Sequence, residues 1–348
     1  MINYEEANID QVSIHRIGDK TENEGVIHTL EPIQITDEKT TTALMKFCCS
    51  AFKTPEFFHF NRSLQELSDN VLEKISKEIF VNPDQVHEQS KLIANHLYEY
   101  SNHPKIKPGD LICCSVRNLL IDDELVDAIG IYKIESLDTF IQLNFDANAY
   151  GLKIKQGIPL DKMEKGCLIF DTEQTQGYKV AIIDKNSSSS EAEYWKMDFL
   201  NLSQRSDNFH HTKGFIQATQ AFVEDKMAEG KEIDALAKAK IMDKSEDYFK
   251  HGEAFDLDNY GKALFGENQM QDDFEDFTQD FQRKREVKLP SQFDISPAAV
   301  KTQNKVFKSV LKLDKNFHVY IHGDRSKIEK GTDANGNKFY KIYFDEER

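Results

Sequence analysis

The amino-acid sequence predicts an α+β fold that combines an antiparallel sheet with amphipathic helices. Short apolar runs separated by Gly, Asp and other polar connections fill residues 111–183 and are typical of an antiparallel meander. On either side, over residues 41–100 and 212–249, apolar residues recur at spacings of three and four, which is the pattern of one helix face. The chain has 348 residues, of which 39% are hydrophobic, so it can bury a core and form two or three domains.

The N-terminal part is expected to form extended segments followed by three helices. Residues 9–17 alternate apolar and polar side chains, and residues 26–35 form a second extended run after a polar turn. Ser63 can cap the second helix, with Glu66 three residues on completing a capping box. The helices are expected at residues 41–52, 64–80 and 86–100.

The central part is expected to form the sheet. Its strands are expected at residues 111–116, 125–134, 140–145, 167–170 and 178–183. Four consecutive serines at residues 187–190 then indicate a loop or a domain boundary. We therefore place a first α+β domain at residues 1–190.

The rest of the chain is expected to form a helical section at residues 191–282 and a small C-terminal β unit at residues 283–348. The acidic stretch 266–282 carries aromatic residues at helical spacing and predicts an amphipathic helix, whereas residues 283–294 look like a linker. Ser296 and Pro297 stand in the favoured N-cap and N1 order of a further helix. The other elements are expected to be helices at residues 194–200, 212–229 and 233–249 and strands at residues 307–313, 317–321 and 339–344.

Charge is distributed unevenly along the chain, which has a formal net charge of -16. Residues 246–282 hold 11 Asp and Glu against two Lys, a net of -9, whereas residues 283–327 hold 11 Lys and Arg against four Asp and Glu, a net of +7. Such segregation suits a protein that meets a polyanion or an acidic partner with one region while the rest repels nucleic acid. The alternative is that each charged run is a solvated face.

Lysines in the basic region are the candidate DNA contacts. Lys301, Lys305, Lys308 and Lys312 follow one another at intervals of four, three and four, so they form one stripe if the segment is a helix. If the segment changes to a strand near Phe307, Lys308 and Lys312 still share a face. Either geometry can contact phosphates without reading bases, and the alternative is a lysine face that keeps an edge strand soluble.

No pattern of residues predicts catalysis, a metal site or a bound cofactor. The five cysteines lack the spacing of a zinc ribbon or a disulfide framework, and neighbours such as Cys113 and Cys114 point to opposite faces if they lie on a strand. Acidic residues before Lys133 suggest a comparison with metal-dependent nucleases, which fails because Ile131 stands where a carboxylate ligand is needed. We therefore expect a protein that is not an enzyme and uses no cofactor.

Several short segments, in their order and spacing, resemble the bacterial nucleoid-associated protein family of the NdpA/YejK type. The resemblance covers most of the chain and implies a non-catalytic homodimer that binds DNA at the nucleoid and is linked to topoisomerase function. The family supplies no catalytic residues to carry over. The segments are Ile14 to Gly18, Ser90 to Leu97, Lys107 to Asp110, Asp127 to Glu135, Lys165 to Ile169, Tyr194 with Trp195, and Phe199 with Leu200.

An alternative function is that of an acidic adaptor for a DNA-handling protein. Phe274, Phe277 and Phe281 lie at helical spacing in the acidic stretch and would anchor it in a basic groove built for nucleic acid. A metal-dependent nuclease is a third hypothesis, for which the sequence lacks ligands. The N-terminus lacks the basic and apolar regions of a signal peptide, and no stretch is apolar enough to span a bilayer, so we expect the protein in the cytoplasm.

Overall fold

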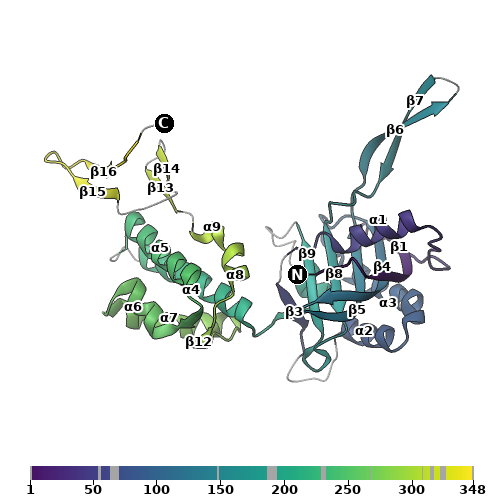
Figure 1. Ribbon diagram of the computed structural model, residues 1–348, viewed down its shortest axis with the longest axis horizontal. Coiled ribbons are helices and arrows are strands. Elements are labelled where there is room, and N and C mark those ends of the chain that lie inside the picture. The colour runs from purple at the N-terminus through teal and green to yellow at the C-terminus, as the bar shows by residue number, and fades with distance from the viewer. Residues whose placement is uncertain are drawn as a thin grey trace. The chain divides into compact units, whose positions relative to one another are not determined.

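The protein forms two compact units, Met1–Arg205 and Ser206–Arg348, in a computed structural model (Figure 1). The first unit contains a large antiparallel sheet with helices, and the second is mainly helical, which confirms the predicted α+β class. The structure describes residues 2–53, 56–62, 70–146, 149–185, 194–228, 233–267, 269–307, 309–313, 317–321 and 327–346.

The first unit is built on an antiparallel sheet of eight strands in the order β10-β3-β9-β8-β5-β4-β1-β2. β1 pairs with β4 along most of its length, although α1, α2 and α3 lie between these strands in the described part of the chain. Four of the five strands predicted in the central part, now β4, β5, β8 and β9, belong to this sheet. The bounds are β1 Asn8–Ile17, β2 Val26–Ile27, β3 Phe57–Phe60, β4 Gly109–Ile121, β5 Glu124–Ile134, β8 Lys165–Phe170, β9 Lys179–Asp184 and β10 Leu202–Gln204.

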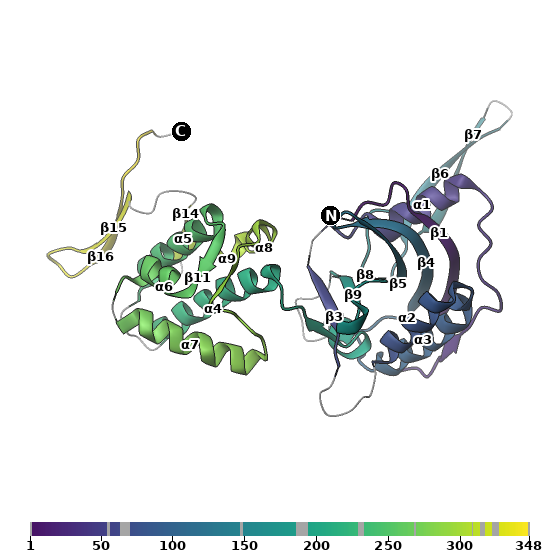
Figure 2. The ribbon, with the colours of Figure 1, turned by 60° about the horizontal axis from the view of Figure 1, so that its bottom comes forward.

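Helices cover both faces of the sheet (Figure 2). Along β4, Cys113 packs into the apolar cluster on one face and Cys114 into the cluster on the other, as predicted for neighbours on a strand. The Sγ atom of Cys114 lies 3.9 Å from that of Cys48, and all five cysteines are buried. The helix on the Cys114 face is α1 (Glu38–Cys49), and those on the Cys113 face are α2 (Val71–Val81), α3 (Val86–Tyr100) and the π-helix η4 (Tyr194–Phe199).

Asn70, at the start of α2, connects two of the elements that cover the Cys113 face of the sheet. Asn70 is the N-cap, and its side-chain oxygen accepts a hydrogen bond from the N–H of Leu72 at 2.9 Å. Its amide nitrogen donates to the carbonyl of Leu200 at 2.9 Å, so one side chain ties α2 to the chain that follows η4. The expected capping pair, Ser63 and Glu66, lies outside the described residues.

A hairpin of two strands projects from the first unit in both views (Figures 1 and 2). It consists of β6 (Asp138–Asp146) and β7 (Ala149–Gly157), which pair only with each other among the described strands. The sequence predicted β6 but not β7. The hairpin is therefore an arm outside the eight-stranded sheet.

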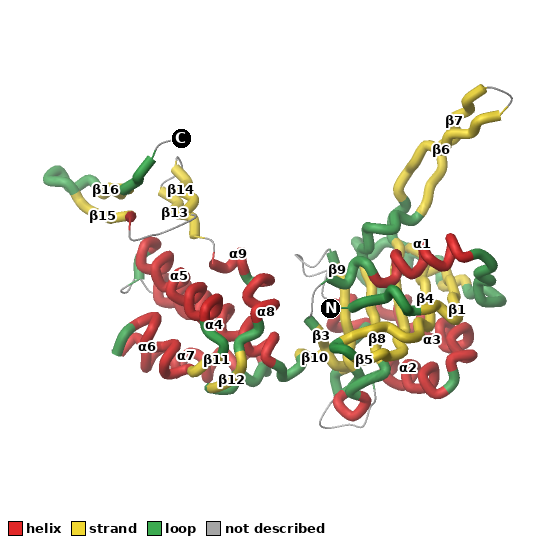
Figure 3. The backbone as a smooth tube through the Cα atoms, in the orientation of Figure 1, coloured by secondary structure: helices red, strands yellow, loops and turns green. Residues whose placement is uncertain are grey.

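The second unit is mainly helical (Figure 3), and its helices pack around an aromatic core. Tyr260 is fully buried at its centre, and its hydroxyl lies 2.7 Å from the hydroxyls of both Thr219 and Ser245. These contacts join three helices through one side chain. The helices of the unit are α4 (Asn208–Ala228), α5 (Ala235–His251), α6 (Leu257–Phe265), α7 (Gln269–Arg285), α8 (Pro297–Thr302) and α9 (Asn304–Phe307).

Residues 283–294, expected to be a linker, belong to this core. Leu289 is buried in it, Val287 and Phe293 pack against it partly buried, and β12 (Gln292–Asp294) pairs with β11 (Ala254–Asp256). The linker prediction is wrong because the charged residues of this segment flank apolar side chains that the core takes up. The expected boundary at residue 282 accordingly falls within α7, and that at residue 190 lies outside the described residues.

The C-terminal part adds two further hairpins to the second unit. β13 (Ser309–Leu313) pairs with β14 (Phe317–Ile321), and β15 (Ile328–Thr332) pairs with β16 (Lys338–Ile342). Ile328 is buried against Leu236 of α5, which docks the last hairpin on a helix.

Candidate nucleic-acid interface

The structure places two of the four predicted DNA-contacting lysines on the surface of the second unit. Lys301 lies in the last turn of α8, Lys305 lies in α9, and both are exposed. On these helices Val300 and Phe307 are buried in the aromatic core, which leaves the lysines to solvent. Lys312 lies in β13, where the structure describes its backbone only, and Lys308 lies outside the described residues.

The segment does not form the single helix on which four lysines make one stripe. Ser296 caps α8 as predicted, because its hydroxyl accepts a hydrogen bond from the N–H of Ala299 at 3.3 Å. The helix then ends at Thr302, a second short helix follows, and a strand begins at Ser309. The alternative in which the segment turns into a strand is therefore the one that the fold adopts.

A second group of exposed cations lies in the last turn of α7 and just after it. Arg283 pairs with Asp280 one turn earlier, and the guanidinium of Arg285 lies 4.5 Å from the centre of the Phe281 ring. Lys284 and Lys288 are exposed and form no ion pair with another described residue, as is also true of Lys301 and Lys305. We call these four lysines, Lys284, Lys288, Lys301 and Lys305, the free lysine group. Cations at a helix C-terminus also interact favourably with the helix dipole, so part of this charge stabilises α7 itself.

The aromatic residues proposed as partner anchors lie inside the second unit. Phe274 is fully buried, Phe281 is 6% exposed, and Phe277 packs partly buried against the same core. The rings of Phe274 and Phe277 lie 5.3 and 5.4 Å from that of Phe222 on α4. These three side chains hold α7 to the core, so α7 would have to detach before they could contact a partner.

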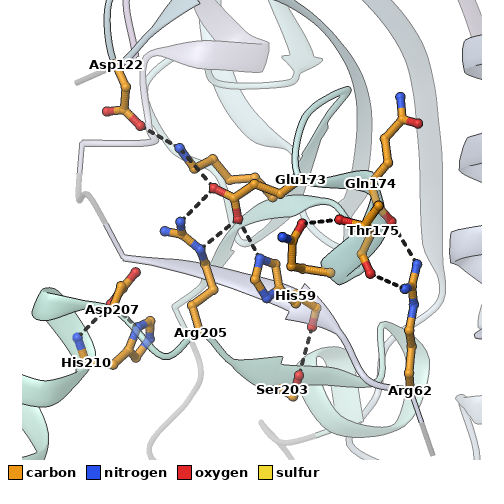
Figure 4. Close-up of polar contacts among 12 residues, drawn as sticks. His59, Arg62, Asp122, Glu173, Gln174, Thr175, Ser203, Arg205, Asp207 and His210 are labelled. Carbon is orange, nitrogen blue, oxygen red and sulfur yellow. Dashed lines mark hydrogen bonds and ion pairs between the residues drawn. The ribbon is translucent and has the colours of Figure 1, made fainter. Parts of the chain in front are cut away.

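Polar residues of the first unit gather around Glu173, which leads into the turn between β8 and β9 (Figure 4). Its carboxylate accepts hydrogen bonds from His59 at 2.5 Å and from Arg205 at 2.7 and 3.0 Å. Burial raises the pKa of Glu173, but the hydrogen bond from His59 and the charges of Arg205 and Lys179 outweigh it and lower the pKa overall. Lys179 in turn donates to Asp122 at 2.5 Å. Cations and carboxylates pair with one another here, which suits a structural junction better than an anion site.

A second charged cluster is fully enclosed in the first unit. Lys133 is 0% exposed, and its Nζ atom donates to the carbonyl of Lys107 at 2.7 Å and lies 3.0 Å from Oε1 of Glu135. Tyr194 lies over both this lysine and Lys165, whose Nζ atoms are 5.7 and 5.1 Å from the ring centre. Four of the segments that carry the family resemblance meet in this cluster, so what they share is a buried polar junction.

The nuclease comparison fails in space as well as in sequence. Ile131 is 1% exposed and packs in the core, and Lys133 is enclosed beside it. Asp127 lies apart from Lys133 on the surface, 3.8 Å from Arg117. Among the described residues, no three His, Cys, Asp or Glu side chains are arranged to hold a metal ion.

Sequence reasoning missed a histidine cluster between β1 and α3. His15 is 1% exposed, its Nε2 atom lies 2.7 Å from the hydroxyl of Ser90, and its ring centre lies 5.4 and 5.8 Å from those of His28 and His87. Burial first, and then His28 and His87, lower the pKa of His15 to about 4. The only sequence signal was that His15 and Ser90 belong to two segments of the family resemblance.

The comparisons with known proteins agree with this resemblance. A family model described as nucleoid-associated protein YejK matches residues 13–342, which is nearly the whole chain. A search of curated proteins gave no match. No helix of the described part of the chain is long and apolar enough to cross a membrane. The match includes segments of both units, and the chain therefore belongs to the nucleoid-associated protein family, which implies a chromosome-associated role.

Proposed function

We propose that the protein binds DNA directly, without reading its sequence and without catalysing a reaction on it. The observation that carries the proposal is the free lysine group, which lies exposed in the segment 284–305 of an otherwise acidic chain. Four ammonium groups without carboxylate partners are available to replace the counterions of a phosphate backbone. They give affinity and orientation, whereas base recognition needs other contacts.

The charge of the rest of the chain limits where DNA can approach. Residues 1–205 hold 33 Asp and Glu against 21 Lys and Arg, a net of -12, and residues 206–282 hold 18 against 8, a net of -10. Residues 283–348 hold 9 Asp and Glu against 15 Lys and Arg, a net of +6. Because charges in physiological salt act over only about 8 Å, a local basic surface can attract DNA despite the net charge of the chain. The C-terminal segment is the region that meets this condition.

The proposal assigns no chemistry to the charged clusters of the first unit. Lys133 is closed off from solvent, the side chain of Glu135 is only 6% exposed, and the Glu173 cluster pairs its charges internally. A binding protein needs neither a nucleophile nor a metal. The adaptor function is not carried forward, because Phe274 and Phe281 are core residues.

Two further parts of the proposal rest on the family. A homodimer would present the free lysine group twice, and two linked sites bind one DNA duplex more tightly than either alone. A protein held on DNA in this way would act on topoisomerase function by sharing its substrate. We include both as parts of the proposed function.

A salt titration of DNA binding tests the proposal. The test variant changes Lys284, Lys288, Lys301 and Lys305 to Gln, and the matched control changes four exposed lysines of the first unit to Gln. The plot of log affinity against log salt should lose up to ~0.9 of slope for each phosphate contact removed in the test variant. The control should keep the wild-type slope. Equal slopes for wild type and test variant, with both proteins folded by circular dichroism, contradict direct binding through these lysines. The control lysines are Lys39, Lys46, Lys53 and Lys77.

A further inference from the structure

The arm formed by β6 and β7 has one apolar face and one polar face. In the register of the hairpin, Ile141 pairs with Ile154, Leu143 with Leu152, and Phe145 with Tyr150. Paired residues and residues two apart on a strand share a face, so these six side chains form one continuous surface. We call this surface, made of Ile141, Leu143, Phe145, Tyr150, Leu152 and Ile154, the apolar ladder.

The apolar ladder is exposed. Its six side chains belong to residues that are 62 to 76% accessible to solvent, whereas the apolar residues of the eight-stranded sheet are mostly buried. Phe and Tyr present roughly 150 to 250 Å² each, and the four Ile and Leu residues lie near the lower end of this range, so at these exposures the ladder offers about 700 Å². A patch of this size exceeds the largest apolar patch of most monomeric proteins and marks an interaction site.

The arm also needs a partner for its own stability. A two-stranded hairpin is marginal in water unless its apolar face is covered, and no other described strand or helix covers this one. The opposite face carries Gln142, Asn144, Lys153 and Lys155, with Phe140 as its one large apolar residue at the base of the arm, so most of this face suits solvent. The ladder is thus the face to be covered.

The chemistry of the ladder argues against a charged partner. It contains no ionisable side chain other than the hydroxyl of Tyr150, and the arm as a whole carries Asp138 and Asp146 against Lys153 and Lys155, a net charge of zero. A nucleic acid or a strongly charged protein would bury phosphates or ions against six apolar side chains without compensation. The occupant must present an uncharged apolar surface of similar width.

We propose that the apolar ladder is a self-association surface and that its partner is the arm of a second copy of this chain. The proposal rests on the homodimer in the proposed function and names the surface that forms it. Two ladders stacked face to face would bury about 700 Å² on each chain, close to the ~800 Å² per partner of a stable interface. A surface that pairs with itself is what a two-fold symmetric dimer requires.

The order of side chains along the ladder suits an antiparallel stack. With the Leu143 and Leu152 row at the centre, the isoleucine row of one arm meets the Phe145 and Tyr150 row of the other. Smaller and larger side chains then alternate across the interface, as they do between packed sheets about 10 Å apart.

Measuring the mass of the full chain in solution tests the proposal. The face variant changes Ile141, Leu143, Leu152 and Ile154 to Thr, which keeps the β propensity of the strands while removing the apolar surface. The control changes Gln142, Asn144, Lys153 and Lys155 on the opposite face to Thr. In sedimentation velocity, wild type and control should behave as a dimer of twice the 40.2 kDa chain, and the face variant should dissociate with a Kd at least 100-fold higher. A monomeric wild type at 100 µM, or a face variant as dimeric as the control, overturns the proposal.

A cysteine cross-link gives a second readout that does not depend on weakening the fold. All five native cysteines are buried, so a cysteine introduced on the arm is the reactive one. Because facing sheets lie about 10 Å apart, which is too far for a direct disulfide, a short bis-maleimide reagent should join two copies of Leu143→Cys, whereas Gln142→Cys on the polar face should remain largely uncoupled. Equal cross-linking of both variants contradicts face-to-face stacking.

DNA affinity measured on the same proteins separates this proposal from the proposed function. If the face variant is monomeric and binds DNA more weakly than the control, both the ladder interface and the proposed DNA binding are supported. If wild type is dimeric through the ladder and binds no DNA at low salt, the function fails and the interface stands. If DNA binding persists in a chain that is monomeric at all concentrations, the interface fails and the function stands.

Discussion

Replacing Lys133 with Met should strongly destabilise the first unit. The ammonium group of Lys133 is fully buried, donates to the carbonyl of Lys107 and lies 3.0 Å from the carboxylate of Glu135, whose side chain is 6% exposed. Burial lowers the pKa of Lys133, and Glu135 partly offsets this effect, so the charged form depends on its partner. Met has a similar volume and removes the charge and the donors without leaving a large cavity.

The expected loss follows from leaving a carboxylate buried without its cation. Breaking a buried pair in this way costs about 3 to 5 kcal/mol of unfolding free energy. Lys162→Met is the matched control, because its pair with Asp138 is exposed, with side-chain accessibilities of 62% and 51%. Exposed pairs contribute up to about 1 kcal/mol, so the control should lose little. Replacing Lys133 with Met and Glu135 with Leu together should recover most of the loss, since both charges are then gone.

Urea unfolding followed by tryptophan fluorescence reports on this unit alone. The chain has one tryptophan, Trp195, which is fully buried in the first unit and donates from its indole nitrogen to the carbonyl of Gly166 at 3.4 Å. The midpoint should fall for Lys133→Met and stay close to wild type for Lys162→Met. A loss below about 1 kcal/mol for Lys133→Met would refute the reasoning, because Glu135 would then tolerate isolation.

Three further predictions concern pH, packing and chemistry. The pKa of His15 is lowered from 6.5 to about 4 in the folded protein, so unfolding takes up a proton between these two pH values. The first unit should therefore lose about 2 to 3 kcal/mol of unfolding free energy as the pH falls from 6.5 to 4. In urea titrations followed by Trp195 fluorescence, His15→Gln should flatten this pH dependence. Tyr260→Phe removes the hydroxyl that contacts both Thr219 and Ser245 and should cost about 1 to 3 kcal/mol in the second unit, measured by far-UV circular dichroism. Incubation with DNA and Mg²⁺ or Mn²⁺ should give no cleavage, whereas cleavage that Asp127→Ala abolishes contradicts a non-catalytic protein.

Local patterns predicted the helices α3, α4 and α5, from apolar residues at spacings of three and four, and the strands β4, β5, β8 and β9, from short apolar runs. These strands are largely buried on both faces, which is why they read as runs and not as an alternation. β7 was missed although Tyr150, Leu152 and Ile154 alternate with Gly151, Lys153 and Lys155, which is the period of a strand with one apolar face. What the segment alone could not show is that this face pairs with that of β6 and stays exposed.

At the candidate interface, too, local patterns predicted the elements but not what they contact. The spacing of Phe274, Phe277 and Phe281 predicted the amphipathic helix α7 but could not say whether its apolar side meets a core or a partner. The charge pattern placed Lys301 and Lys305 on the surface, which the structure bears out, while the free Lys284 and Lys288 were hidden in an apparent linker. Long-range contacts such as that of His15 with Ser90 join residues far apart in the chain and leave no local signal.

Lysine footprinting on DNA is the most direct test of the account. The chain is treated with an acetylating reagent with and without a short duplex, and the modified lysines are identified by mass spectrometry. The account predicts that DNA protects Lys284, Lys288, Lys301 and Lys305, while the exposed first-unit lysines Lys39, Lys46, Lys53 and Lys77 react equally in both conditions. Protection of the first-unit lysines alone, or no protection while DNA is bound, would contradict the claim that the C-terminal segment of the second unit holds DNA.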